Sequence, residues 1–169
     1  MRFLFLFIPV LFLFGCTNDR TTLKTLQSEI NYLNAKNDSL EKEIQNIKPG
    51  LGDLMLMIQV HHNKLYFAGK LENWKLAQFE HDEIMKILKQ AESIEKERSE
   101  VKLFKSMIYP QMDSIQIAIG RKNEERFYYS FNSLTNACNN CHTNTKFEFN
   151  RIISDPEHPP YSNQEFQLK

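Results

Sequence analysis

The sequence lacks an excess of charge of one sign, a long apolar run and the signals of β-hairpins. Its 21 basic side chains balance 21 acidic ones, which gives no reason to expect a nucleic-acid partner. The main apolar run, residues 3–14, is too short to span a bilayer. Neither Asn-Gly nor Asp-Gly occurs between residues 51 and 149, and runs of β-branched residues are few. We therefore predict an all-α fold.

The first fifteen residues have the pattern of an export signal. Arg2 precedes an apolar run of the length found in secretory signal peptides. The run ends in Leu13-Phe14-Gly15-Cys16, which resembles the lipobox of bacterial lipoproteins. This resemblance implies that residues 1–15 are removed and that Cys16 carries the lipid; an ordinary signal peptide cleaved nearby is the alternative. Loss of Arg2 would leave 20 basic against 21 acidic side chains.

Residues 23–48 carry the heptad pattern of a coiled coil. Residues 16–22, which begin with the predicted lipidated Cys16, are expected to form the linker that precedes it. A single Asn at an a position, together with β-branched residues at other a positions and Leu at d, favours two parallel strands. We predict a parallel homodimer; a trimer, or a helix that folds back on its own domain, remains the alternative. Pro49-Gly50 is expected to end the helix. The a positions are Leu23, Ile30, Asn37 and Ile44, and the d positions are Leu26, Leu33, Leu40 and Ile47.

Residues 51–150 are predicted to form a four-helix bundle around one core. Helical patterns cover about 51–68, 73–100, 107–119 and 123–149, and the loops between them are short. Asn73 is expected to cap the second of these helices. The tail, residues 151–169, is rich in Pro and Asn and is expected to be an irregular segment over the bundle, anchored by Phe166.

The most specific motif is Cys138-Asn139-Asn140-Cys141-His142, a C-x-x-C-H run of the kind that attaches c-type haem. Helix positions three apart share a face, so both thiols can reach one porphyrin while the adjacent imidazole approaches the iron. A structural zinc site would need a second ligand pair, and a redox dithiol would need a βαβ setting. With Cys16 lipidated, no cysteine is left for a disulfide. We therefore predict one covalent haem c.

A four-helix bundle with C-x-x-C-H on its last helix resembles the cytochrome c-prime superfamily, including its low-spin branch. The resemblance implies that Cys138 and Cys141 form the thioethers and that His142 is the proximal iron ligand. It also implies that Lys146, one turn further on, lies beside the imidazole. Leu51 stands where the family often has an arginine near a haem propionate, so a propionate partner must come from elsewhere.

The resemblance places the distal position of the haem near Leu54 or Met55. A methionine sulfur would complete a low-spin site suited to electron transfer, whereas leucine would leave the iron open to NO or CO. We predict Met55 as the sixth ligand, with an ordinary core methionine as the alternative. His62 is the rival ligand, although hydrogen-bonded or surface roles are the commoner fate of His61 and His62. His81 is expected to be solvated.

Together these patterns predict a mono-haem electron-transfer lipoprotein of the bacterial envelope. No catalytic pair of carboxylates and no nucleophile with its base stands out, so we expect a carrier and not an enzyme. The expected partners are a periplasmic redox protein of unknown identity and a membrane. The outer membrane is favoured because Thr17 is not an obvious retention residue. A gas-binding module and a scaffold for an envelope complex are the alternatives.

Overall fold

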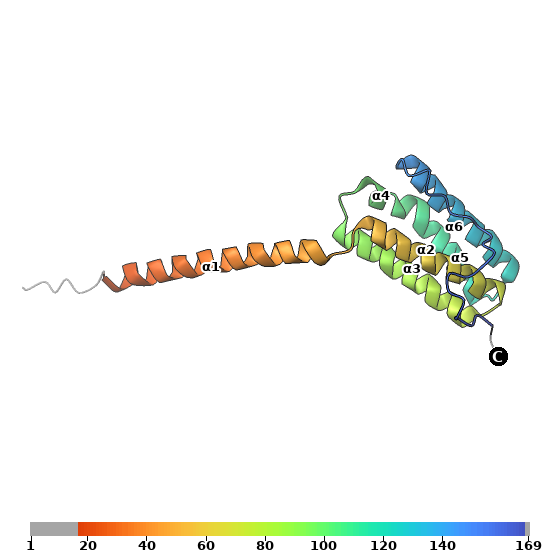
Figure 1. Cartoon of the computed structure of the whole chain (residues 1–169), viewed down its shortest axis with the longest axis horizontal. Coiled ribbons are helices and arrows are strands. Elements are labelled where there is room, and N and C mark those ends of the chain that lie inside the picture. Colours follow the sequence, from red (N-terminus) through yellow and green to blue (C-terminus); the bar gives the residue numbers. More distant parts are fainter. Residues whose placement is uncertain (1–16, 168–169) are drawn as a thin grey trace, which may run out of the picture. The chain divides into compact units, whose positions relative to one another are not determined.

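The computed structural model describes residues 17–167, all of whose regular structure is helical. The prediction of an all-α fold is thereby confirmed. The predicted signal segment, residues 1–15, and Cys16 lie outside the described residues. The chain divides into two compact units, Met1–Lys48 and Pro49–Lys169 (Figure 1). None of the described helices is both long and apolar enough to cross a membrane.

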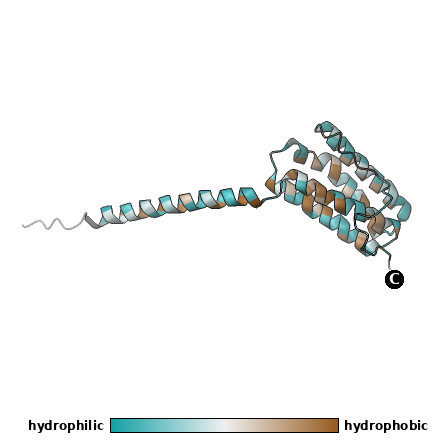
Figure 2. Cartoon of the chain, viewed as in Figure 1, coloured by the Kyte–Doolittle hydropathy of each residue, from teal (hydrophilic) through white to brown (hydrophobic). Residues whose placement is uncertain are grey.

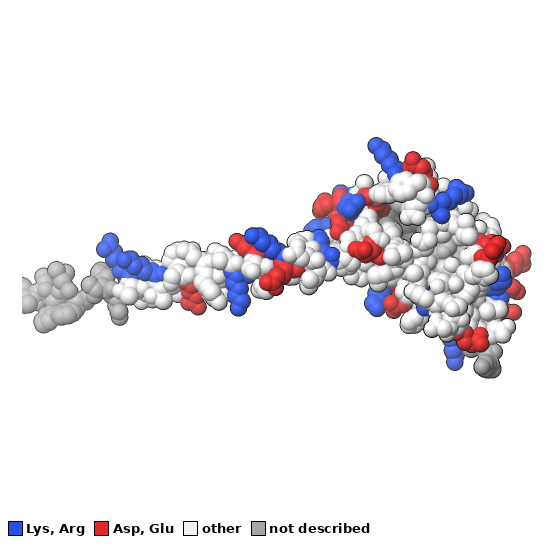
Figure 3. Space-filling view, in the orientation of Figure 1, with Lys and Arg blue, Asp and Glu red and all other residues white. Residues whose placement is uncertain are grey.

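The first unit contains one long helix, α1 (Thr17–Ile47), which begins six residues before the predicted heptads. Apolar residues recur along it among hydrophilic ones (Figure 2), and charges of both signs alternate on its surface (Figure 3). The apolar a and d side chains are between 47% and 79% exposed. Asn37 donates a hydrogen bond from Nδ2 to Oε1 of Glu41, one turn on, at 2.9 Å. An isolated helix with such an exposed apolar stripe is stabilised by a partner that covers the stripe.

The second unit contains four long helices and a short connecting region. α2 packs mainly on α3 and α5 on α6, while α3 also contacts α5 and α2 contacts α6. One apolar core fills the space between them, with Leu54, Leu65, Phe127 and Phe131 fully buried. The elements are α2 (Leu51–Lys70), α3 (Trp74–Ile94), α4 (Ser99–Lys102), the π-helical turn η1 (Phe104–Ile108), α5 (Tyr109–Gly120) and α6 (Glu124–Asn144).

Helices α2 and α6 approach closely at Gly69. A Cβ atom built on Gly69 would lie nearer to the ring of Phe127 than the 3.0 Å that real Cβ atoms keep. The Phe127 ring is fully buried and contacts Trp74, with 6.0 Å between ring centroids. Gly69 therefore lets the aromatic ring of α6 lie directly on the backbone of α2.

The C-terminal segment, residues 145–167, is irregular throughout. It contacts the connection between α2 and α3 at Asn73. As predicted, Asn73 caps α3, because its Oδ1 accepts a hydrogen bond from the Leu76 backbone N–H at 3.2 Å. Its Nδ2 donates to the backbone oxygen of Phe166 at 3.0 Å. Phe166 is buried, and its ring lies 5.9 Å from that of Phe67. The tail is thus anchored by Phe166, as its sequence indicated.

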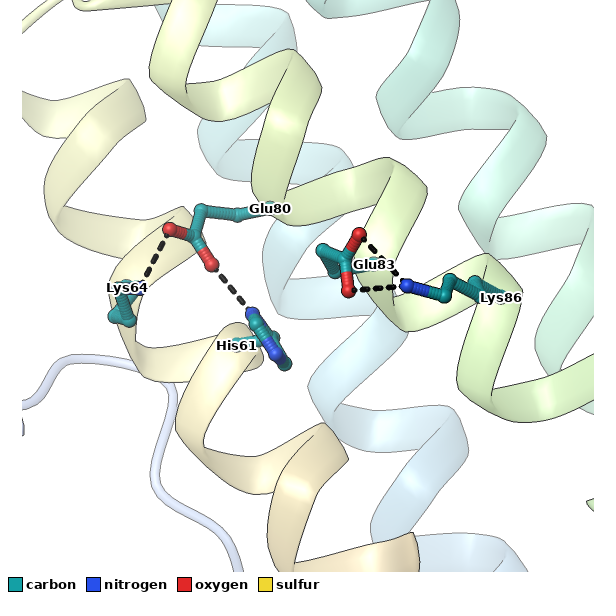
Figure 4. A network of polar contacts seen from close by, with 5 residues as sticks. All are labelled: His61, Lys64, Glu80, Glu83 and Lys86. Atoms are coloured by element: carbon teal, nitrogen blue, oxygen red, sulfur yellow. Dashed lines mark hydrogen bonds and ion pairs between the residues drawn. The ribbon is translucent and has the colours of Figure 1, made fainter. Parts of the chain in front are cut away.

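A buried carboxylate also joins α2 to α3 (Figure 4). Glu80 is fully buried, and its two oxygens lie 2.6 Å from Nδ1 of His61 and 2.9 Å from Nζ of Lys64. A buried charge is tolerated when it is paired in this way. The hydrogen-bonded role predicted for His61 is therefore confirmed.

The prediction that His81 is solvated was wrong. The side chain is buried, and its Nε2 lies 3.2 Å from the backbone oxygen of Met112 on α5. Its Nδ1 lies 3.0 Å from Oδ1 of Asp82. The charged residues around His81 in the sequence indicated a surface helix, but this position faces α5.

Candidate functional site

The second unit contains a cavity of about 520 Å³. Its walls come from α2, α3, α6, the segment between α3 and α5, and residues 145–150 that follow α6. Its size lies within the range of cofactor sites in proteins, roughly 300–1,000 Å³. Cys138, Cys141 and His142 of α6 line it, and so does Met55 of α2. The rest of the wall is mostly apolar, with Ile84, Leu88, Phe104, Ile108 and Leu134 among its residues.

The two cysteines lie one turn apart on α6 and are free thiols. Burial raises the pKa of Cys138 to about 12, with a further contribution from nearby Cys141. Burial also raises the pKa of Cys141, and the charge of Glu100 acts in the same direction. Both thiols are therefore protonated at neutral pH. Reactive dithiols have a lowered cysteine pKa, so this pair does not have their electrostatics.

His142 is oriented by the chain that follows its helix. Its Nδ1 lies 2.6 Å from the backbone oxygen of Asn150. Because a carbonyl oxygen can only accept, Nδ1 carries the proton and Nε2 keeps a lone pair that can bind a metal. Ligating histidines in proteins are commonly held by such a bond from the other ring nitrogen.

The end of α6 explains how Asn150 returns to His142. Lys146 adopts a positive φ of 67°, and the Phe147 N–H donates to the His142 carbonyl oxygen at 2.7 Å. The Lys146 N–H donates to the Thr143 oxygen at 3.3 Å. These two bonds form a Schellman motif, which ends the helix and reverses the chain. The helix therefore ends at Asn144, five residues before the predicted end at residue 149.

Lys146 lies outside this cavity. It is exposed, and it does not contribute to the cavity wall. The structure gives Lys146 a role as the helix-ending residue, and its predicted place beside the proximal imidazole stays a prediction.

Of the two residues at the expected distal position, one lines the cavity. Met55 lies in its wall, whereas Leu54 is fully buried in the core and does not. Leu51 also contributes to the wall. Met57, two residues beyond Met55, is exposed. The side chain of Met55 is therefore the thioether that α2 brings to the same cavity as His142.

His62 also lines the cavity, but one of its nitrogens is already used. Burial lowers its pKa to about 4, so the ring is neutral at physiological pH. Its Nε2 lies 2.9 Å from Oγ1 of Thr135, and the Thr135 hydroxyl donates to the Phe131 oxygen at 3.0 Å. Thr135 must then accept from Nε2–H, which leaves only Nδ1 with a lone pair. The hydrogen-bonded role predicted for His62 is confirmed.

Arg98 is a candidate residue that the sequence analysis missed. Among residues 17–167 it is the one lysine or arginine in the wall of the cavity. Its Nη2 lies 3.1 Å from Oε1 of Glu100, which also lines the wall. The Glu100 backbone N–H lowers the pKa of that carboxyl, against the opposing effect of burial, and Arg98 lowers it further. No local pattern marks Arg98, because α4 and the segment around it carry no motif.

Residues 17–167 contain no cluster of three or more His, Cys, Asp or Glu side chains that could hold a metal ion by themselves. Comparison with protein-family models, with curated proteins and with solved structures finds no significant match to this chain.

Proposed function

We propose that this chain is a membrane-anchored, mono-haem c-type cytochrome that transfers single electrons in the bacterial envelope. The observation that carries the proposal is the shared cavity, to which α6 contributes Cys138, Cys141 and His142 and α2 contributes Met55. In this proposal α2, α3, α5 and α6 are the four helices of a cytochrome c-prime type bundle. The protein is then a carrier of electrons and not an enzyme.

The residues of the cavity fit a haem in their chemistry. Cys138 and Cys141 would form the thioethers, and the lone pair of His142 Nε2 would serve as the proximal ligand. Met55 would supply the sixth ligand. Bound haem supplies reversible one-electron chemistry at its iron. Arg98 offers a cation to a propionate carboxylate, which is the partner that Leu51 cannot provide.

One feature favours electron transfer over binding of NO or CO. A thioether in the cavity can occupy the distal side of the haem, which raises the reduction potential and excludes gases. His62 is a weaker rival for that position, because Nε2–H is bonded to Thr135. Gas binding would follow if Met55 stayed unligated.

The proposal places the lipid on Cys16 and a parallel homodimer at α1. The exposed a and d side chains of α1 would then pack against those of a second copy. The lipid would hold the chain in the periplasm, on the outer membrane in our proposal, where it exchanges electrons with a redox partner of unknown identity. Acidic and basic side chains are interspersed on the face of the second unit in Figure 3, so that face offers no basic strip for a nucleic acid.

Covalent haem is the first result that the proposal predicts. The full chain, produced in a bacterium that matures c-type cytochromes, is expected to keep its haem on a denaturing gel stained for peroxidase activity. Replacement of both thiols, Cys138→Ala with Cys141→Ala, removes both thioether bonds and should abolish the stained band. Cys16→Ser is the matched control, since it removes only the predicted lipid and should keep the haem. A wild-type chain without covalent haem would contradict the proposal.

Dimerisation through α1 is the second expected result. The d-position changes Leu26→Glu with Leu33→Glu place charges in the seam and should raise the dimer dissociation constant at least about a hundredfold, because each buried leucine contributes roughly 2–5 kcal/mol. Tyr32→Glu is the control, since Tyr32 is exposed on the same helix but lies outside the a and d positions. Sedimentation equilibrium of the full chain in detergent measures the change. A wild-type monomer or trimer would refute the parallel dimer.

A further inference from the structure

Asn139, a variable position of the C-x-x-C-H motif, holds the backbone of the C-terminal segment. Its Nδ2 donates to the backbone oxygen of Ile152 at 2.9 Å, and its Oδ1 accepts from the backbone N–H of Ile152 at 2.8 Å. One side-chain amide thus satisfies both backbone groups of one residue. An amide has the donor and the acceptor that this needs, whereas a carboxylate or a hydrophobic side chain does not.

The same short segment contacts His142. Asn139 and His142 lie three positions apart, so they share a face of α6. Asn139 binds residue 152, and His142 Nδ1 donates to the oxygen of residue 150. In the part of the chain that the structure describes, these three hydrogen bonds are the ones that fix residues 150–152 to α6.

We propose that Asn139 is a positioning residue that sets the reduction potential of the site, because it holds the Asn150 carbonyl oxygen against His142 Nδ1. This inference rests on the proposed function, in which His142 Nε2 binds the iron. A carbonyl that accepts from Nδ1–H increases the electron density of the imidazole and makes Nε2 a stronger donor. A stronger donor stabilises Fe(III) relative to Fe(II) and lowers the reduction potential.

The neighbouring residue supplies a matched control. Asn140 has the same side chain and is the other variable position between the two cysteines. It is exposed, and within residues 17–167 its side-chain amide makes no hydrogen bond. Covalent attachment uses the thiols of Cys138 and Cys141, so replacement of either asparagine leaves the attachment residues in place.

The test compares the reduction potentials of the full haem-loaded chain with Asn139→Ala and with Asn140→Ala. Asn139→Ala should raise the potential, by up to a tenfold change in the reduction equilibrium, which for one electron is about 59 mV. Asn140→Ala should leave it unchanged. In the same samples, hydrogen exchange of the Ile152 amide should become at least tenfold faster in Asn139→Ala only, because that N–H loses its acceptor.

A second pair of variants approaches the same contact from the other side. Ile152→Pro removes the backbone N–H that donates to Asn139 Oδ1. It should therefore raise the reduction potential, as Asn139→Ala does. Ile153→Pro is its control, since the exposed Ile153 has no hydrogen bond of its backbone N–H within residues 17–167. This pair keeps the test decisive if Asn139→Ala does not fold.

The outcomes separate the inference from the proposed function. Wild type without covalent haem would refute the proposed function. Covalent haem in every variant, with equal potentials in Asn139→Ala and Asn140→Ala, would overturn the inference alone. Faster exchange at Ile152 without a change of potential would likewise overturn it, since Asn139 would then hold the segment without acting on His142.

Discussion

Met55→Ala is expected to convert a low-spin, six-coordinate haem into a high-spin haem that binds CO. The Met55 side chain lies in the wall of the cavity that also contains His142, and alanine has no sulfur to offer the iron. Loss of a thioether ligand also lowers the reduction potential. Optical spectra of the oxidised and reduced full chain, with and without CO, measure the change. The weak far-red sulfur-to-iron band of the oxidised wild type should disappear in the variant.

Met57→Ala is the control for this experiment. Met57 lies on the same helix but is exposed and outside the cavity wall, so its spectra should match those of the wild type. A wild type that is already high-spin and CO-reactive would contradict ligation by Met55 and make gas binding the leading function. A Met55→Ala protein that stays low-spin would instead point to Nδ1 of His62, and Met55→Ala with His62→Ala would then become high-spin.

Gly69→Ala should destabilise the second unit strongly. The new methyl group would overlap the ring of Phe127, and that ring is fully buried, so it cannot move without disturbing the core. Overpacking of this kind costs roughly 2–3 kcal/mol, which exceeds the gain of about 1 kcal/mol from replacing a helical glycine. Urea unfolding followed by circular dichroism measures the free energy of unfolding.

Gly120→Ala is the matched control, because a Cβ at Gly120 meets no atom within 4 Å. We expect it to be neutral or to stabilise the protein by up to about 1 kcal/mol. Phe127→Leu should partly rescue Gly69→Ala, since the smaller side chain makes room for the methyl group, and a double-mutant cycle isolates that coupling. Equal stabilities of Gly69→Ala and wild type would show that the close approach of α2 and α6 is dispensable.

The sequence alone determined the local features of this protein. The helical periods, the cap at Asn73 and the spacing of Cys138 and Cys141 each depend on residues within one or two turns, so they follow from the order of residues. The helix ends were less predictable. Lys146 ends α6 through a positive φ, and the usual glycine that would mark such a turn is absent.

Tertiary structure decided which of these residues share a cavity. The sequence favoured Met55 over Leu54 only through the chemistry of its thioether. Adjacent helix positions differ in direction by about 100°, and only the packing of α2 on its neighbours decides that Met55 lines the cavity while Leu54 is buried in the core. Nor could it find Arg98, or the bond between His62 and Thr135, which are 73 positions apart. Asn139 and Asn140 are equivalent in the motif, and only the return of the C-terminal segment to α6 distinguishes them. Such contacts join residues far apart in sequence, so local sequence patterns cannot predict them.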